Sequence, residues 1–349
     1  DSAVVAISGQ QASTWQRMTL GISSIISAHL LNFSLIPHRD REDTLLYNGI
    51  INVYKEAGFT SHDVVAKLRG IFGQRKIGHT GTLDPAATGV LPVCLGNGTK
   101  LVDMITDRSK VYEARVLLGV TTDTEDTTGT ETGKRELAGE FFAGDSEDVA
   151  DNIKRVLEGF TGGYDQIPPM YSAIKKDGKR LYELAREGKE IDRAARHVEI
   201  YSIELISVEL PYFTMRVHCG KGTYIRSLCR DIGAQIGCGA CMDRLCRTQV
   251  GRFTLSEALT LEKLQKLKDE DRLSEEVIPV DVMFEEYMPV HVGKEYFKLI
   301  KNGNKVDSRI CCGLYSPVRM YCDGVFYGIY ELDDRKKEYY PVKMFACGE

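Results

Sequence analysis

No stretch of 18 or more apolar residues occurs in this 349-residue sequence. The nearest is residues 20–36, which polar residues and glycines interrupt and which lacks the basic start of a signal peptide. A bilayer span needs about 20 apolar residues, so we expect neither membrane insertion nor secretion. The ten cysteines are irregularly spaced and several lie in apolar runs, which favours a reduced, cytoplasmic protein over a disulfide framework.

Motifs for nucleotide or metal chemistry are also missing. The sequence has no Gly-Lys-Ser/Thr after a glycine-rich loop, no G-x-G-x-x-G after a strand and no H-E-x-x-H. Residues 96–100, Gly-Asn-Gly-Thr-Lys, are a weak phosphate-binding candidate. Cys238 and Cys241 have a C-x-x-C spacing with Cys229 and Cys246 nearby, but no histidine lies among them and the other spacings do not fit a zinc ribbon or finger. We therefore expect no bound metal.

Neither sign of charge is in large excess, because the sequence has 45 basic and 50 acidic residues and a formal net charge of −5. The acidity is concentrated in residues 121–151, with a net charge of −8, and residues 257–286, with −6, which leaves +9 for the rest. A basic face that binds nucleic acid is compatible with this pattern. Two solvated acidic faces without meaning for partners are compatible with it as well.

The hydrophobic spacing predicts an α+β fold with antiparallel hairpins and no regular βαβ alternation. Strands are expected at residues 50–54, 90–95, 111–120, 198–210 and 212–219, and helices at residues 61–72, 149–157, 180–187, 223–236 and 259–267. Thr60 and Asp63 resemble a capping box and Gly73 ends that helix. Residues 121–133 are expected to form a polar loop. Residues 318–330 predict two strands around Asp323-Gly324, in a small β-rich module after a boundary at 279–289.

Four residues are candidates for chemistry, and each also has an ordinary interpretation. Asp84 precedes a proline, which biases it towards an extended conformation, although Asp-Pro also starts many turns. Arg226 follows a Gly-Lys-Gly turn at a helix start, where its guanidinium can pair with a carboxylate or lie at the surface. Tyr112 begins an apolar strand face, where a tyrosine is normally part of the core. His79 lies in a glycine-rich loop, where a histidine usually faces solvent.

Residues 78–92 read Gly-His-Thr-Gly-Thr-Leu-Asp-Pro-Ala-Ala-Thr-Gly-Val-Leu-Pro. This pattern resembles the catalytic motif of TruB-type tRNA pseudouridine synthases. Four further segments, in the family's order, resemble its K-P-x-G-x-[ST]-S, K-x-Y, Q-x-P-P-x-[FY]-S-A-x-K and G-T-Y-I-R patterns: residues 55–61, 110–112, 166–175 and 222–228. Glu56 departs from the family's proline. The resemblance covers about residues 48–260, and the tail resembles a PUA-type RNA-binding module more faintly.

The resemblance implies isomerisation of uridine to pseudouridine at position 55 in the T-loop of tRNA, on a base flipped out of its stack. The reaction involves no redox change, so no cofactor is expected. A carboxylate can attack covalently or stabilise an oxocarbenium-like centre, and this role falls to Asp84. Arg226 would be its salt-bridge partner. Tyr112 would stack on the target base and take the proton from C5.

Further residues would bind the RNA. His79 would stack where the extruded base leaves the loop, and Leu245 would line the pocket. Basic side chains would meet phosphates, which makes binding depend on salt; they are Lys55, Lys175, Lys176, Lys179 and Arg180. The last four can equally be a solvated helix end.

The resemblance also implies an organisation. Residues 47–285 would form the catalytic domain and residues 286–349 the PUA-like module. Residues 1–46 match nothing in the family's pattern and are expected to be an extension from a misassigned start near Leu46. The partner would be the tRNA T-arm, and we expect a monomer that contacts no membrane and needs no protein partner.

Three other functions are weighed against this one. A guide-RNA-dependent synthase of the dyskerin type shares a similar aspartate loop, but the Q-x-P-P segment and the short tail favour the stand-alone kind. An RNA-binding or tRNA-folding protein would bind without needing Asp84. A glycoside hydrolase would need a second acid beside Asp84, and the nearest in sequence, Asp63 and Asp103, lie outside the motif.

Overall fold

The computed structural model describes residues 47–349 except 177, 190, 311–314 and 346–349. The predicted extension, residues 1–46, lies outside these described residues. Residues 46–349 form one compact unit. No helix in the described part of the chain is long and apolar enough to span a bilayer.

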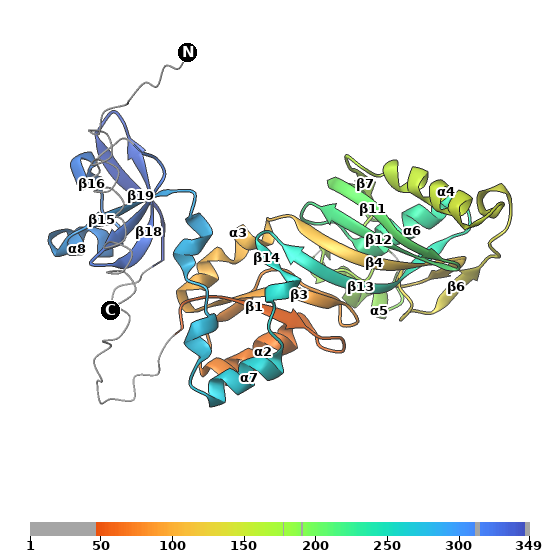
Figure 1. Ribbon diagram of the computed structural model, residues 1–349, viewed down its shortest axis with the longest axis horizontal. Coiled ribbons are helices and arrows are strands. Elements are labelled where there is room, and N and C mark those ends of the chain that lie inside the picture. The colour runs from red at the N-terminus through yellow and green to blue at the C-terminus, as the bar shows by residue number, and fades with distance from the viewer. Residues whose placement is uncertain (1–46, 177, 190, 311–314, 346–349) are drawn as a thin grey trace, which may run out of the picture. The chain divides into compact units, whose positions relative to one another are not determined.

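A large mixed sheet lies at the centre of the larger part of the fold and confirms the α+β prediction (Figure 1). Its central strand order is β1-β3-β13-β4-β12-β11, with β2 on β3 and β14 on β13. The strands are β1 (Gly49–Lys55), β2 (Ile77–His79), β3 (Thr88–Leu95), β4 (Lys110–Leu118), β11 (Ile200–Glu209), β12 (Tyr212–Cys219), β13 (Ala240–Val250) and β14 (Phe253–Thr254). All neighbours are antiparallel except β13 and β3.

The parallel pairing of β3 with β13 joins two antiparallel halves of this sheet. It runs through Thr88 and Gly89, opposite Cys246 and Arg247. A Cβ on Gly89 would lie 2.2 Å from the carbonyl oxygen of Arg247. The two backbones can therefore approach this closely because position 89 has no side chain.

Alternating side chains of β4 and β12 form the core of the larger half. The buried apolar residues of β4 are Tyr112, Ala114, Val116 and Leu118, at the alternate positions of a strand, and Lys110 is buried as well. They pack with the apolar faces of α4 (Ser146–Glu158) and α6 (Ile225–Ile236). At the other half, α2 (Ser61–Phe72) and α7 (Leu261–Asp269) pack together against β1 and β3 (Figure 1).

Local signals at α2 are confirmed, and one prediction elsewhere is wrong. Thr60 and Asp63 form the capping box, and Gly73 ends α2 in the left-handed conformation. The expected loop at 121–133 contains a hairpin of β5 (Val120–Thr122) and β6 (Glu131–Lys134), because polar exposed strands carry no hydrophobic alternation. The phosphate-binding candidate is a 3-10 helix, Gly96–Leu101, whose glycines pack against the backbone around Gly49.

The remaining elements are short. Two more antiparallel pairs join β7 (Tyr164–Gln166) to β10 (Arg196–Val198) and β8 (Lys175–Lys176) to β9 (Lys179–Arg180). The short helices are α3 (Val102–Thr106), α5 (Leu181–Arg186) and α8 (Phe297–Lys301). A five-stranded sheet has the order β15-β17-β18-β19-β16. Its strands are β15 (Met288–Val292), β16 (Val306–Asp307), β17 (Val318–Cys322), β18 (Val325–Asp333) and β19 (Glu338–Met344). The predicted hairpin at Asp323-Gly324 is confirmed, with both residues at positive φ.

The close approach at Gly89 predicts a large effect of a single methyl group. Gly89→Ala should lower the free energy of unfolding by roughly 2–4 kcal/mol, because overpacking against β13 adds to backbone strain. Gly58→Ala is the matched control: its φ of +89° is also left-handed but nothing lies within 4 Å of its Cβ position. It should cost about 1 kcal/mol. Urea unfolding measures both, and equal losses would contradict a tight β3–β13 approach.

Candidate active site

The loop between β2 and β3 presents Asp84 on a fixed backbone. The Leu83 N–H donates to the hydroxyl of Ser61, the first residue of α2, at 3.0 Å. The Gly58 N–H donates to the Pro85 carbonyl at 2.9 Å, so both neighbours of Asp84 are held. The Asp84 side chain is 38% exposed. Its carboxylate is therefore open to a substrate while its backbone is tied to α2.

Lys55 lies beneath this loop and does not face phosphates as expected. It is fully buried, and its ammonium donates to the carbonyls of Glu56, Pro85 and Ala87 at 3.0, 3.1 and 2.6 Å. All three donors are used within the protein. Burial lowers the pKa of Lys55 to about 8, against the opposing effect of the Asp84 charge. Glu56 contributes a carbonyl that a proline would also have, so the departure from the family's pattern preserves this contact.

Arg226 is the partner of Asp84, and the structure brings the two together. Its Nε lies 2.9 Å from Oδ2 and its Nη2 lies 3.3 Å from Oδ1 of Asp84, which is a bidentate pairing. The other donors reach the carbonyls of Thr124 at 3.0 Å and Tyr171 at 2.8 Å. The Asp126 carboxylate lies 3.9 Å from Nε. A guanidinium that is 6% exposed thus has its charge and its hydrogen bonds satisfied.

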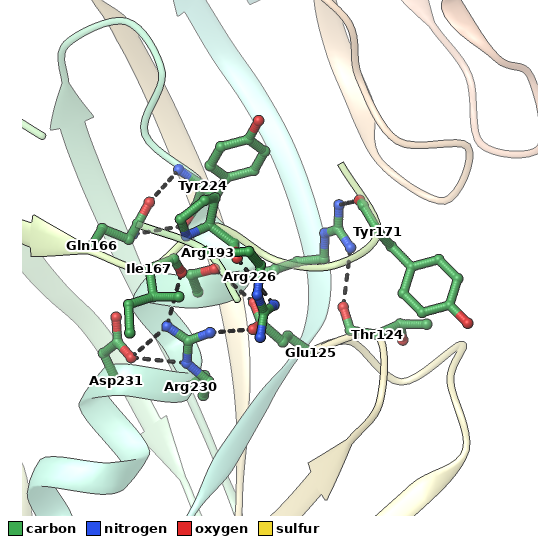
Figure 2. Close-up of polar contacts among 12 residues, drawn as sticks. Thr124, Glu125, Gln166, Ile167, Tyr171, Arg193, Tyr224, Arg226, Arg230 and Asp231 are labelled. Carbon is green, nitrogen blue, oxygen red and sulfur yellow. Dashed lines mark hydrogen bonds and ion pairs between the residues drawn. The ribbon is translucent and has the colours of Figure 1, made fainter. Parts of the chain in front are cut away.

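The start of α6 fixes the direction of Arg226. Gln166 caps this end of the helix: its Oε1 accepts the Tyr224 N–H at 2.9 Å and its Nε2 donates to the Tyr224 carbonyl at 3.1 Å (Figure 2). Figure 2 also shows Glu125 and Arg230 beside this helix end. The sequence interpretation missed both residues, because the pairing of side chains 105 positions apart leaves no local pattern.

Tyr112 and Leu245 face the same core as the Asp84 loop. Tyr112 on β4 lies opposite Arg247 on β13, and Leu245 lies opposite Ala114. Both pack with Leu83 in one hydrophobic cluster. Burial raises the pKa of Tyr112, so its phenol is protonated at neutral pH.

Arg247 is a site residue that the sequence interpretation missed. It is 1% exposed. Its Nε donates to the Val90 carbonyl at 2.8 Å and its Nη2 to the Gly81 carbonyl at 3.3 Å. These carbonyls lie on either side of Asp84 in the chain, so Arg247 closes the loop. No sequence signal separates a buried arginine of this kind from a surface one.

His79 ends β2 and is half-buried. Burial, the nearby His62 charge and Arg247 lower its pKa, which keeps the imidazole neutral at pH 7. The His62 ring lies 5.5 Å from the His79 ring in an edge-on arrangement. His62 thus extends the aromatic surface at this edge of the loop, and we had not singled it out.

The basic cluster lies on the β8–β9 hairpin. Lys175, Lys179 and Arg180 are exposed, and the side chain of Lys176 lies outside what the structure describes. Lys179 pairs with Glu187 at 3.4 Å. The structure does not gather these residues around Asp84, and both interpretations of the cluster stay open.

The cysteines show no ligand arrangement. Cys229, Cys238, Cys241 and Cys246 have free thiols. Burial raises the pKa of Cys241 to about 11. Across the described residues, no three His, Cys, Asp or Glu side chains are grouped as metal ligands would be.

Two solved structures share this fold over most of the chain. A Cbf5–Nop10–Gar1 complex matches with a TM-score of 0.61 and 25% identity, over 86% of this chain and 85% of the matched chain. An H/ACA RNP bound to a substrate RNA containing 2′-deoxyuridine matches with a TM-score of 0.60 and 24% identity, over 85% of both chains. The fold is therefore that of the Cbf5 class of proteins.

Sequence comparisons narrow the class to a family. Residues 69–225 match the N-terminal domain of TruB family pseudouridylate synthases, and residues 226–285 match the C-terminal domain of tRNA pseudouridylate synthase B. The tRNA pseudouridine synthase B of Lachnoclostridium phytofermentans is 50% identical over 85% of this chain and 99% of its own length. That of Clostridium perfringens strain 13 is 45% identical over 82% and 96%. The chain belongs to the TruB family of pseudouridylate synthases.

The buried ammonium of Lys55 predicts a pH dependence of stability. Its pKa is about 8 in the folded protein and ordinarily 10.5, so between these values the unfolded chain binds more protons. The cost of burying the charge is full below about pH 8 and is relieved as the pH rises. Wild type should therefore gain stability relative to Lys55→Met between pH 7 and pH 10, since other titrating groups cancel. Urea unfolding at both pH values measures the difference.

The control is Lys154→Met. Lys154 is exposed, and its contact with Asp151 raises its pKa. Its difference from wild type should show no such gain. A Lys55→Met difference that is constant with pH would contradict the burial of a charged ammonium.

Proposed function

We propose that this protein isomerises uridine to pseudouridine at position 55 in the T-loop of tRNA, with Asp84 as the reacting carboxylate. The observation that supports this most directly is the Asp84–Arg226 pair on its rigid loop. The family and the names of the 41–50% identical relatives supply the reaction class. The site supplies one exposed carboxylate with a buried counter-ion.

The chemistry accounts for these residue types. The N1–C1′ bond breaks, the base turns over, C5 bonds to C1′, and the proton leaves C5, so the product is an isomer. Asp84 would attack covalently or stabilise the electron-poor centre. Arg226 would pair with the carboxylate and aim it at the reacting centre. These roles need no group from outside the chain.

Tyr112 and its neighbours would hold the flipped base. A protonated, buried phenol is a poor base at neutral pH, so stacking suits Tyr112 better than proton removal from C5. Leu245 would supply an apolar wall on the β13 side. His79, neutral and half-buried, would stack in the space that the extruded base leaves.

The RNA would extend beyond this pocket. The exposed β8–β9 hairpin follows Tyr171 by a few residues and offers Lys175, Lys179 and Arg180 to phosphates. The module that begins near residue 286 would bind the same tRNA as a PUA-like domain. We propose a cytoplasmic monomer that acts on the T-arm without an obligate protein partner. The guide-RNA-dependent alternative is supported by the fold. However, this chain is only 24–25% identical to the solved structures of that kind and 50% identical to a tRNA pseudouridine synthase B.

Tritium release tests the reaction. Wild type should release tritium from an unmodified tRNA transcript labelled at uridine C5, and Asp84→Asn should slow release by about a thousandfold or more while still binding the transcript. Asp151→Asn, an exposed carboxylate on α4, is the matched control and should leave the rate unchanged. Tritium release by Asp84→Asn at the wild-type rate would show that Asp84 is not the reacting carboxylate. Binding without release by wild type would point to an RNA-binding protein.

Salt dependence tests the hairpin. Lys175→Gln should weaken tRNA binding and reduce the slope of log K against log salt concentration by about 0.7–0.9, because one phosphate contact is lost. Lys154→Gln, on the acidic helix α4, should change neither. Filter binding at several KCl concentrations measures the slopes. Equal slopes for Lys175→Gln and wild type would show that Lys175 contacts no phosphate and that the hairpin is solvated surface.

A further inference from the structure

A second arginine repeats the bridge that Arg226 makes. Arg230 lies four residues later on α6, on the same face and one turn further along. Its guanidinium contacts the carboxylate of Glu125, lies 2.8 Å from Asp231 Oδ1 and donates to the Ile167 carbonyl at 3.1 Å (Figure 2). Arg226 and Arg230 thus tie α6 to the same two segments of the chain, one around residue 125 and one around residue 170.

Glu125 holds the first of these segments in an unusual turn. It has a φ of 63°, a left-handed conformation that non-glycine residues rarely adopt. Its side chain is 10% exposed, and its carboxylate accepts the Ser227 hydroxyl at 2.6 Å besides contacting Arg230. Its carbonyl accepts the Met242 N–H at 3.0 Å. The buried carboxylate therefore holds the turn that aims the neighbouring Thr124 carbonyl at Arg226.

The second segment is held through Asp231. Its Oδ2 accepts the Tyr164 hydroxyl at 2.9 Å. Gln166 donates to the same Tyr164 oxygen at 2.6 Å while it caps α6. Burial raises the pKa of Tyr164, so the hydroxyl keeps its proton as a donor. This chain of contacts fixes the strand that leads to Ile167 and on to the Tyr171 carbonyl.

We propose that the Glu125–Arg230 pair positions Arg226 for the reaction, an inference that rests on the proposed isomerase. Neither residue contacts Asp84. They set the two carbonyls, of Thr124 and Tyr171, between which the Arg226 guanidinium is held. Without the pair, both segments lose a tie to α6, and Arg226 loses its fixed direction towards Asp84. Catalytic geometry is sensitive to such shifts, since a displacement of about 1 Å can cost a hundredfold in rate.

The test compares single and double variants in steady-state tritium release. Arg230→Gln and Glu125→Gln should each lower kcat by about tenfold to a hundredfold, with KM for tRNA within about twofold of wild type. The double variant should be no slower than the slower single variant, because the pair acts as a unit. Arg230→Lys keeps the charge and should recover part of the rate. Arg272→Gln, which breaks an exposed ion pair with Glu275, is the matched control and should leave kcat unchanged.

Four outcomes would overturn the proposal. Rates are taken per folded molecule, well below the thermal midpoint of each variant. A lower midpoint with an unchanged kcat would make the pair structural only. A rise in KM at constant kcat would assign it to tRNA binding, and strictly multiplicative losses in the double variant would show two independent effects. If wild type itself releases no tritium, the proposed isomerase fails and the positioning role fails with it.

Discussion

A guanidinium that is 6% exposed must have its charge balanced and its donors filled, and Arg226 is such a group. The partners come from segments far apart in the chain: the Asp84 carboxylate and the carbonyls of Thr124 and Tyr171. None of these segments has a regular secondary structure at its contact with Arg226. Arg226 therefore fixes the positions of three loops relative to one another. The start of α6 at Tyr224 in turn fixes the position of Arg226.

Buried cations with filled donors also lie beneath the Asp84 loop. Lys55 and Arg247 are buried cations that donate to loop carbonyls. Their charges repel each other, and the Asp84 charge offsets this for Lys55. Asp84 thus lies among three buried cations, one paired with its carboxylate and two bound to the backbone around it. Charge-assisted hydrogen bonds from Lys55 and Arg247 therefore help to hold the loop, and such bonds are shorter and stronger than neutral ones.

Local signals in the sequence predicted much of this, and long-range ones did not. The capping box at Thr60, the alternation of β4 and the Asp323-Gly324 hairpin follow from rules that act within a few residues. The motif around Asp84 indicated the loop and, by resemblance, Arg226. Lys55 was expected at the surface and Arg247 was overlooked, because burial of a cation depends on carbonyls contributed by other segments. The Glu125–Arg230 pair could not be predicted from the sequence for the same reason.

The parallel pairing of β3 with β13 has a consequence for how the chain folds during synthesis. β13 lies between β3 and β4 in the sheet but follows both in the chain, after α6. On the ribosome the N-terminal strands emerge first, so the two antiparallel halves can form while their facing edges lack a neighbour. Arg247 and Leu245 arrive with the strand that closes this gap. A nascent chain that already contains the whole Asp84 motif thus lacks Arg247 and Leu245 beside it until the centre of its sheet, synthesised late, is inserted.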